Sequence, residues 1–84
     1  MEIAWDEPKR LSTIKDRGLD FAELDAEFFA ASTVVPAKLG RFMAIGAFGG
    51  DVIVVVFAPL GSEAVSVISM RRASRKERRI HERA

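Results

Sequence analysis

The sequence predicts an α+β domain in which two N-terminal helices accompany a compact antiparallel sheet and a basic helix closes the chain. Three observations lead to this class: helically spaced apolar residues before residue 31, apolar strand-like runs between residues 41 and 70, and an arginine-rich segment after them. The length of 84 residues allows one domain, residues 1–84, with a small core. Such an arrangement favours helices packed on one face of the sheet.

The first elements are a short strand and a helix. Residues 2–5, EIAW, are typical of a strand. Asp6 can cap a helix that has Pro8 in its first turn, where the missing N–H does little harm. Leu11 and Ile14 form a thin apolar stripe, and Gly18 ends this helix.

A second helix is predicted directly after this glycine. Asp20 is its N-cap, and Glu23 stands three residues later, where a capping partner is expected. The apolar residues that follow have helical spacing. The side chains expected to face the core are Phe21, Leu24 and Phe28.

The middle of the chain predicts an antiparallel meander. Residues 41–48 and 51–58 flank Gly49-Gly50, which is a strong hairpin signal. The second of these runs is apolar on both faces, so we expect it to be a central strand, with residues 64–70 as the third long strand. Residues 33–38 contain a proline and are expected to form an edge strand or a loop.

The end of the third long strand carries two adjacent arginines. Strict alternation places one set of side chains on one face: Val65, Val67, Ser69 and Arg71. The other face receives Ser66, Ile68, Met70 and Arg72. The two guanidinium groups therefore leave the strand in opposite directions. Ser74 and Glu77 then have the spacing of a capping box that opens the terminal helix.

Charge is distributed unevenly along the chain. Residues 71–84 carry seven Lys or Arg against two Asp or Glu, a balance of +5. Residues 1–70 carry six against ten, a balance of −4, so the net charge of +1 hides an acidic body and a basic tail. This asymmetry indicates a polyanionic ligand or an acidic partner protein. A solvated helix with scattered ion pairs would produce the same pattern, so both explanations stay open.

Composition excludes several other classes. The chain has no cysteine, hence no disulfide and no thiolate metal site, and its single histidine, His81, excludes a multi-histidine metal centre. No glycine-rich phosphate loop is present. The longest apolar run, residues 52–60, is too short to cross a bilayer as a helix, and Met1 leads directly into a charged segment. We therefore expect a cytoplasmic protein without a membrane partner, a cofactor or a metal.

One face of the terminal helix could carry chemistry. Glu77, Arg78 and His81 are related by three and four residues and so share that face. RNA cleavage needs a base for the 2′-OH, cations for the phosphorane oxygens and an acid for the leaving oxygen, and these residue types provide all three. The commoner explanation is structural: Glu77 caps the helix and His81 is solvated.

Four segments of the chain, in order, resemble the BrnT family of small toxins from bacterial type II toxin–antitoxin systems. They are WDEPKR (5–10), RGLDFAE (17–23), RFMAIG (41–46) and VISMRRASRKERRIHE (67–82). The resemblance implies a RelE-like fold and cleavage of RNA without a metal. It also implies neutralisation by a BrnA-like antitoxin that binds operator DNA, so that the toxin reaches DNA only within that complex. A homodimer or a heterotetramer is the expected assembly.

The same resemblance identifies candidate site residues. Those that match positions of the family motifs are Lys9, Arg41, Ser69, Arg71, Arg72, Ala73, Glu77 and Arg78. We expect Arg41, Arg71 and Arg72 to bind phosphate and stabilise transition-state charge. Proton transfer is expected from Glu77 and His81. Additional RNA contacts are expected from Lys9, Arg75 and Arg78.

Some positions depart from the family pattern. They are Thr13, Asp16, Arg17, Ser66 and His81, where the family often has asparagine, lysine, histidine, arginine and tyrosine. These departures allow an alternative function, in which a catalytically weakened toxin acts as a binding module or corepressor with its antitoxin. A third possibility is general nucleic-acid binding by the basic helix alone.

Overall fold

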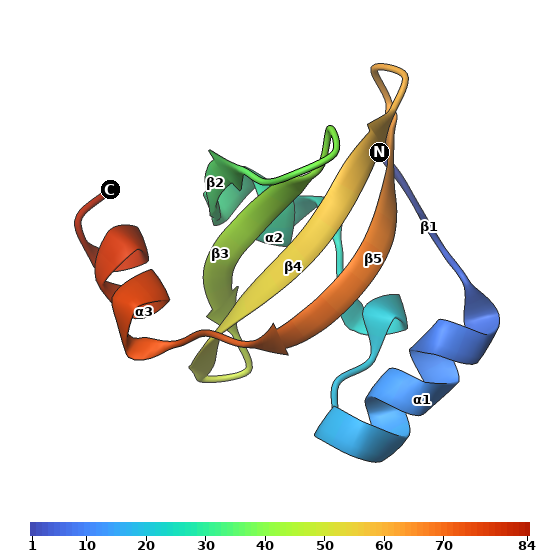
Figure 1. The fold of residues 1–84 in the computed structure, drawn as a ribbon, viewed down its shortest axis with the longest axis horizontal. Coiled ribbons are helices and arrows are strands. Elements are labelled where there is room, and N and C mark those ends of the chain that lie inside the picture. The colour runs from blue at the N-terminus through green and yellow to red at the C-terminus, as the bar shows by residue number, and fades with distance from the viewer.

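Five strands form one mixed sheet in the computed structural model, which describes residues 1–84 (Figure 1). Their order across the sheet is β1-β5-β4-β3-β2. The bounds are β1 Glu2–Trp5, β2 Thr33–Pro36, β3 Phe42–Phe48, β4 Asp51–Leu60 and β5 Ala64–Arg72. The predicted meander is confirmed, because β2, β3, β4 and β5 pair antiparallel in sequence order, and residues 33–36 form the edge strand.

The first strand departs from an all-antiparallel sheet. β1 lies parallel to β5, with Glu2 opposite Ala64 and Trp5 opposite Val67. No hairpin sets the direction of this pair, since most of the chain separates the two strands. The long connection through the helices permits the parallel arrangement, which the local sequence does not reveal.

The N-terminal helix has the predicted ends. α1 spans Glu7–Arg17; the Asp6 side chain accepts a hydrogen bond from the backbone N–H of Lys9, and Gly18 ends the helix at φ 67°. A left-handed residue at this position favours glycine because no Cβ is present to clash.

The predicted second helix is interrupted. A short 3₁₀ segment, η1, spans Phe21–Glu23, and a separate helix, α2, spans Ala26–Ala31. Asp20 accepts from the N–H of Ala22, while Asp25 accepts from the N–H of Phe28 and begins the new helix. Two capping aspartates five residues apart therefore divide the segment, and Glu23 makes no capping hydrogen bond.

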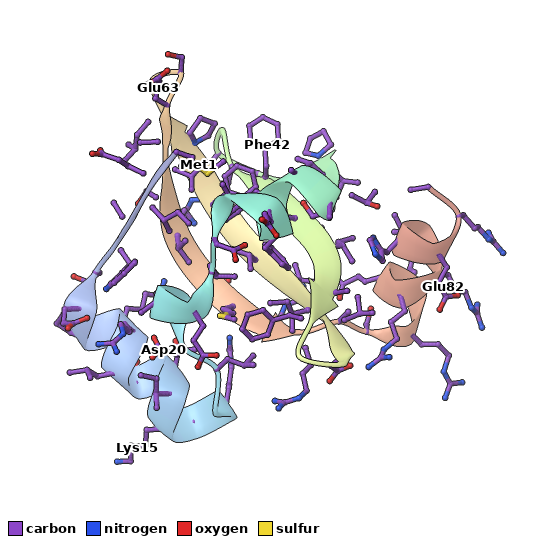
Figure 2. All side chains as sticks on the ribbon, turned by 180° about the vertical axis from the view of Figure 1, so that it is seen from behind. Met1, Lys15, Asp20, Phe42, Glu63 and Glu82 are labelled. Carbon is purple, nitrogen blue, oxygen red and sulfur yellow. The ribbon has the colours of Figure 1, made fainter.

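One face of the sheet, called here the closed face, packs against η1 and α2. Seven of its strand residues belong to the main core cluster: Ala44, Ile53, Val55, Phe57, Val65, Val67 and Met70. The helical side contributes Leu19, Phe21, Leu24, Phe28 and Phe29, as the sequence predicted for Phe21, Leu24 and Phe28. Gly46 allows this contact, because a Cβ there would lie only 3.0 Å from the Phe28 ring. Figure 2, drawn from behind, shows α2 and η1 in front of the sheet.

A β-bulge in β5 changes the predicted facing of its side chains. Ser69 pairs with Val56 and Val67 pairs with Phe57, so Ile68 has no partner on β4. The extra residue shifts the alternation, which places Val65 and Val67 on the same face as Met70 and Arg72. The predicted grouping of Val65 and Val67 with Ser69 and Arg71 is therefore wrong, although the opposite directions of Arg71 and Arg72 are retained.

The opposite face, called here the open face, carries the terminal helix. Cross-strand pairing aligns one residue from each of four strands in a row on this face: Thr33, Ile45, Val54 and Arg71. α3, Arg75–Glu82, contacts both ends of the row through His81 and Glu77. The expectation that all helices lie on one face is thus wrong for α3. Figure 1 shows the rest of this face uncovered between α3 and α1.

Candidate functional site

α1 lies beside the part of β5 that β1 leaves unpaired. β1 pairs only with Ala64–Val67, so no strand pairs with the outer edge of the last residues of β5. Arg17 Nη1 donates to the Met70 carbonyl oxygen at 3.0 Å, and Arg72 Nη1 donates to the Arg17 carbonyl oxygen at 3.0 Å. These two hydrogen bonds in opposite directions hold the end of α1 against the end of β5.

A polar cleft of about 290 Å³ separates α1 from β5. Its walls contain no apolar residue and consist of Lys9, Ser12, Thr13, Asp16, Arg17 and Ser69. The Thr13 hydroxyl is buried and donates to the Lys9 carbonyl oxygen at 2.8 Å, whereas the Lys9 ammonium makes no ion pair. Three of the positions that depart from the family pattern therefore line the same cleft as Lys9. Helical spacing from residue 9 could have revealed this grouping.

Arg71 and Glu77 form a two-point ion pair at the edge of the open face. Arg71 Nη1 and Nη2 donate to the two Glu77 carboxylate oxygens at 2.7 and 2.8 Å. Glu77 also accepts from the Ser74 N–H and completes the predicted capping box. The hydrogen bonds from Arg71, and then those from Ser74, lower the pKa of Glu77 to about 2, while Glu77 raises the pKa of Arg71. The guanidinium is thus fixed in place and remains 38% exposed.

Arg72 takes part in a different group on the other side of the strand. Its Nε lies 3.4 Å from Asp51 Oδ2, and Arg78 also donates to Asp51. The pKa of Asp51 is lowered, first by the hydrogen bond from the Val52 N–H and then by Arg78. Asp51 thus links β5, α3 and the hairpin, and the sequence pattern did not mark it. In the sequence, only its place directly after the Gly49-Gly50 turn could have drawn attention to Asp51. Its contact with Arg72 depends on the register between β4 and β5, which the sequence does not reveal.

His81 lies at the far end of the open-face row. Its Nδ1 is 3.0 Å from the Thr33 hydroxyl oxygen, so the histidine is half-buried and not simply solvated. Three strand spacings separate Thr33 from Arg71, which corresponds to about 14 Å between their Cα atoms. Glu77, Arg78 and His81 therefore share one helix but contact three different partners.

The remaining predicted cations are exposed and lie apart. Arg41 precedes β3, four residues from Ile45 of the open-face row, or about 13 Å along the strand. Arg75 occupies the first position of α3 and makes no ion pair. The structure consequently brings Arg71 to Glu77, and Arg72 to Arg78 through Asp51, but it does not bring Arg41 to either group.

A second cleft is unsuited to a polyanion. It has a volume of about 350 Å³ between α2 and the β3–β4 turn, and Glu23, Asp25 and Glu27 surround it. These carboxylates would repel phosphate. No group of three histidine, aspartate or glutamate side chains has a metal-binding arrangement, and no helix is long and apolar enough to cross a membrane.

Comparison with known proteins agrees with this architecture. Residues 5–77 match the model of a family described as the ribonuclease toxin BrnT of type II toxin–antitoxin systems. The 1.1 Å crystal structure of the Brucella abortus ribonuclease toxin BrnT is 58% identical to this chain, with a TM-score of 0.82. The match covers 89% of this chain and 99% of the Brucella chain. No curated protein matches the sequence. The chain therefore belongs to the BrnT family of ribonuclease toxins of type II toxin–antitoxin systems.

Proposed function

We propose that this chain cleaves RNA on the open face between α1 and α3, and that it does so as the toxin of a cytoplasmic toxin–antitoxin pair. The observation that carries the proposal is the Arg71 guanidinium, which Glu77 holds in one orientation on the open face, the same face of β5 whose Ser69 lines the polar cleft of Lys9. Ser69 lines that cleft and shares a face with Arg71, about 7 Å away along the strand. Lys9 and Arg71 can therefore contact one segment of RNA backbone.

The reaction follows from the chemistry of RNA. The 2′-oxygen attacks the adjacent phosphorus, its proton passes to a base, the bond from phosphorus to the 5′-oxygen breaks, and that oxygen receives a proton. Negative charge develops on the phosphorane oxygens during this step. Arg71 has N–H groups that Glu77 does not engage, and these can donate to those oxygens.

Glu77 is better suited to orienting Arg71 than to moving a proton. A carboxyl group whose pKa is about 2 is a poor proton acceptor near neutral pH. His81 carries the only imidazole of the chain, a side chain that can both accept and donate a proton, and Thr33 engages only its Nδ1, which leaves Nε2 for proton transfer. Ile45 and Val54 of the open-face row are fully buried, so RNA would run alongside α3, from Arg71 towards His81.

The other cations have supporting roles in this proposal. Arg72 positions the end of α1 and the hairpin through Arg17 and Asp51, and so acts on the site indirectly. Arg75 and Arg78 attract the RNA backbone along α3, whereas Arg41, which precedes β3 and lies apart from both arginine groups, is left out of the RNA site. The groups available to balance phosphorane charge are guanidinium and ammonium groups, which supports a mechanism that needs no metal.

The toxin–antitoxin assignment implies an antitoxin partner, and we propose that a BrnA-like protein neutralises this chain by binding it. Operator DNA would be reached only through that antitoxin. A partner that binds only the folded chain should raise its melting temperature by mass action, which matters in a domain of marginal size.

Induction of the chain alone tests the proposed function. We expect growth arrest and RNA degradation, and we expect the purified chain to cleave RNA equally well in EDTA. Normal growth with confirmed soluble expression, together with intact RNA, would instead support the weakened-toxin alternative. One observation favours that alternative: Asp16 places a negative charge in the cleft of Lys9.

A further inference from the structure

Exposed apolar side chains gather at the end of the sheet farthest from Arg71. Leu39 is 88% exposed in the β2–β3 turn, Leu60 is 49% exposed at the end of β4, and Met1 is 61% exposed before β1. Exposed Pro36 and Pro59 lie at the same end, and together these five residues are called the apolar end. The Glu2 N–H donates to the Glu63 carbonyl oxygen at 2.9 Å, which holds the chain start beside the β4–β5 turn. Figure 2 shows Met1, Phe42 and Glu63 together there.

Leu39 is held in a conformation that leucine rarely adopts. Its φ is 61°, in the left-handed region, and Gly40 follows at φ 71°. Two hydrogen bonds fix the turn: Ala37 N–H to the Arg41 carbonyl oxygen at 2.9 Å, and Arg41 N–H to the Lys38 carbonyl oxygen at 3.2 Å. The left-handed conformation is unfavourable for a residue with a Cβ, because the Cβ crowds the following carbonyl oxygen. The side chain gains almost no burial within the chain in return.

The charges beside Leu39 indicate what could cover it. Lys38 and Arg41 flank the leucine on both sides, and neither forms an ion pair within the chain. A polyanion would engage these cations but would gain little from leucine, methionine and proline side chains. A protein segment that combines acidic and apolar residues complements both features.

We propose that the apolar end docks an acidic, apolar segment of the antitoxin, with Leu39 as the central anchor. This inference rests on the proposed function in one respect, the existence of an antitoxin partner. Leu60 pairs with Ala64 at the start of β5, whereas Arg71 lies at the other end of β5, so the apolar end and Arg71 are at opposite ends of the sheet. Antitoxin binding and RNA cleavage should therefore be separable by mutation.

Two substitutions at Leu39 test the docking surface. Leu39→Gly removes the side chain and suits the positive φ, so the fold is preserved, while Leu39→Asp adds a charge that repels an acidic partner. Leu11→Asp is the matched control, because Leu11 is also exposed, at 56%, but lies on α1. Calorimetric titration with the purified product of the adjacent antitoxin reading frame gives the Kd for each variant, and a cleavage assay gives its activity.

Both Leu39 variants should cleave RNA like the wild type and bind the antitoxin about tenfold or more weakly, whereas Leu11→Asp should bind normally. Unchanged affinity of both Leu39 variants would overturn the inference. Loss of binding by Arg79→Glu and Arg83→Glu alone would assign docking to α3 and would also overturn it. So would dissociation of a dimer of the free chain by Leu39→Asp, because the apolar end would then be an interface between two copies of this chain. An inactive wild type would refute the proposed function, while the comparison of Kd values would still locate the docking surface.

Discussion

The two faces of the sheet are stabilised by different forces. On the closed face, a cluster of twelve buried apolar residues joins the strands to η1 and α2, with Phe29 in edge-to-face contact with both Phe28 and Phe57. On the open face, α3 is joined to the sheet by the Arg71–Glu77 pair and the His81–Thr33 hydrogen bond, and the Arg78–Asp51 pair ties it to the start of β4. Burial supplies most of the stability, and the polar contacts determine where cationic groups point.

This difference explains how a helix with few apolar residues keeps a defined position. Ile45 and Val54 are fully buried on the open face, yet they lie outside the main core cluster. α3 packs beside β3 on this face, and the contacts that fix it are ion pairs and one hydrogen bond, which are individually modest. Mutations on the closed face should therefore unfold the protein, whereas those on the open face should mainly change chemistry.

The largest effect is expected from a truncation on the closed face. Phe21 is completely buried, so Phe21→Ala should lower the free energy of unfolding by about 3–5 kcal/mol and leave little stability in a domain of this size. Urea denaturation measures the loss. Leu11→Ala, at an exposed position, should change stability by less than about 0.5 kcal/mol, and equal losses for the two variants would contradict the role of the closed face.

A smaller effect, dependent on pH, is expected at the Arg71–Glu77 pair. The folded pKa of Glu77 is about 2, below its ordinary value, so the carboxylate stabilises the fold above about pH 5 and loses this contribution as the pH falls towards 2. After allowance for solvent near Arg71, Glu77→Gln should cost about 2 kcal/mol at neutral pH. Urea titrations at several pH values should show the difference between wild type and variant shrinking between about pH 5 and 2. A difference that is constant with pH would argue against the pair.

Loss of the Asp51 link should loosen α3 without unfolding the sheet. Asp51→Asn removes the charge that Arg72 and Arg78 share, while the amide oxygen can still accept from the Val52 N–H. We expect faster hydrogen exchange confined to α3 and the end of α1, with protection of β3 and β4 unchanged. Equal acceleration throughout the sheet would show that Asp51 supports the whole fold.

The smallest effects are expected from charges that point only to solvent. Arg79→Ala and Arg83→Ala should weaken RNA binding slightly and lower its dependence on salt, because each removes one contact with the phosphate backbone. Filter-binding measurements at two salt concentrations test this expectation. An effect of either variant that is unchanged by salt would indicate a specific contact instead.

Local signals in the sequence predicted much of the fold. Asp6, Gly18 and the Ser74–Glu77 capping box mark helix ends as the structure has them, and Gly49-Gly50 marks the hairpin. These features depend on residues within one turn of each other, which is why pattern alone reveals them. The interruption of the second helix by Asp25 was missed because two successive capping residues compete, and spacing does not decide between them.

Contacts distant in sequence could not be predicted in the same way. The bulge at Ile68, the parallel direction of β1 and the side of the sheet that α3 occupies all depend on pairing between strands. The candidate site shows the same limit. Arg71 and Glu77 were both predicted as site residues, and they do contact each other. The role of Asp51 could not be predicted, because its contact with Arg72 depends on the register that joins the hairpin to the end of β5.

The most direct measurement is RNA cleavage by purified, folded Arg71→Ala and Arg72→Ala variants, compared with Arg71→Lys at two salt concentrations. Arg71→Ala should reduce the rate roughly 100- to 1000-fold, as for loss of one transition-state donor, and lysine should rescue poorly because it lacks the planar fork. Arg72→Ala should lose much less, because Arg72 contacts Arg17 and Asp51 and not the open face. If both alanine variants lose the same modest activity and added salt reproduces that loss, the arginines only attract RNA, and Arg71 is not the charge-stabilising group.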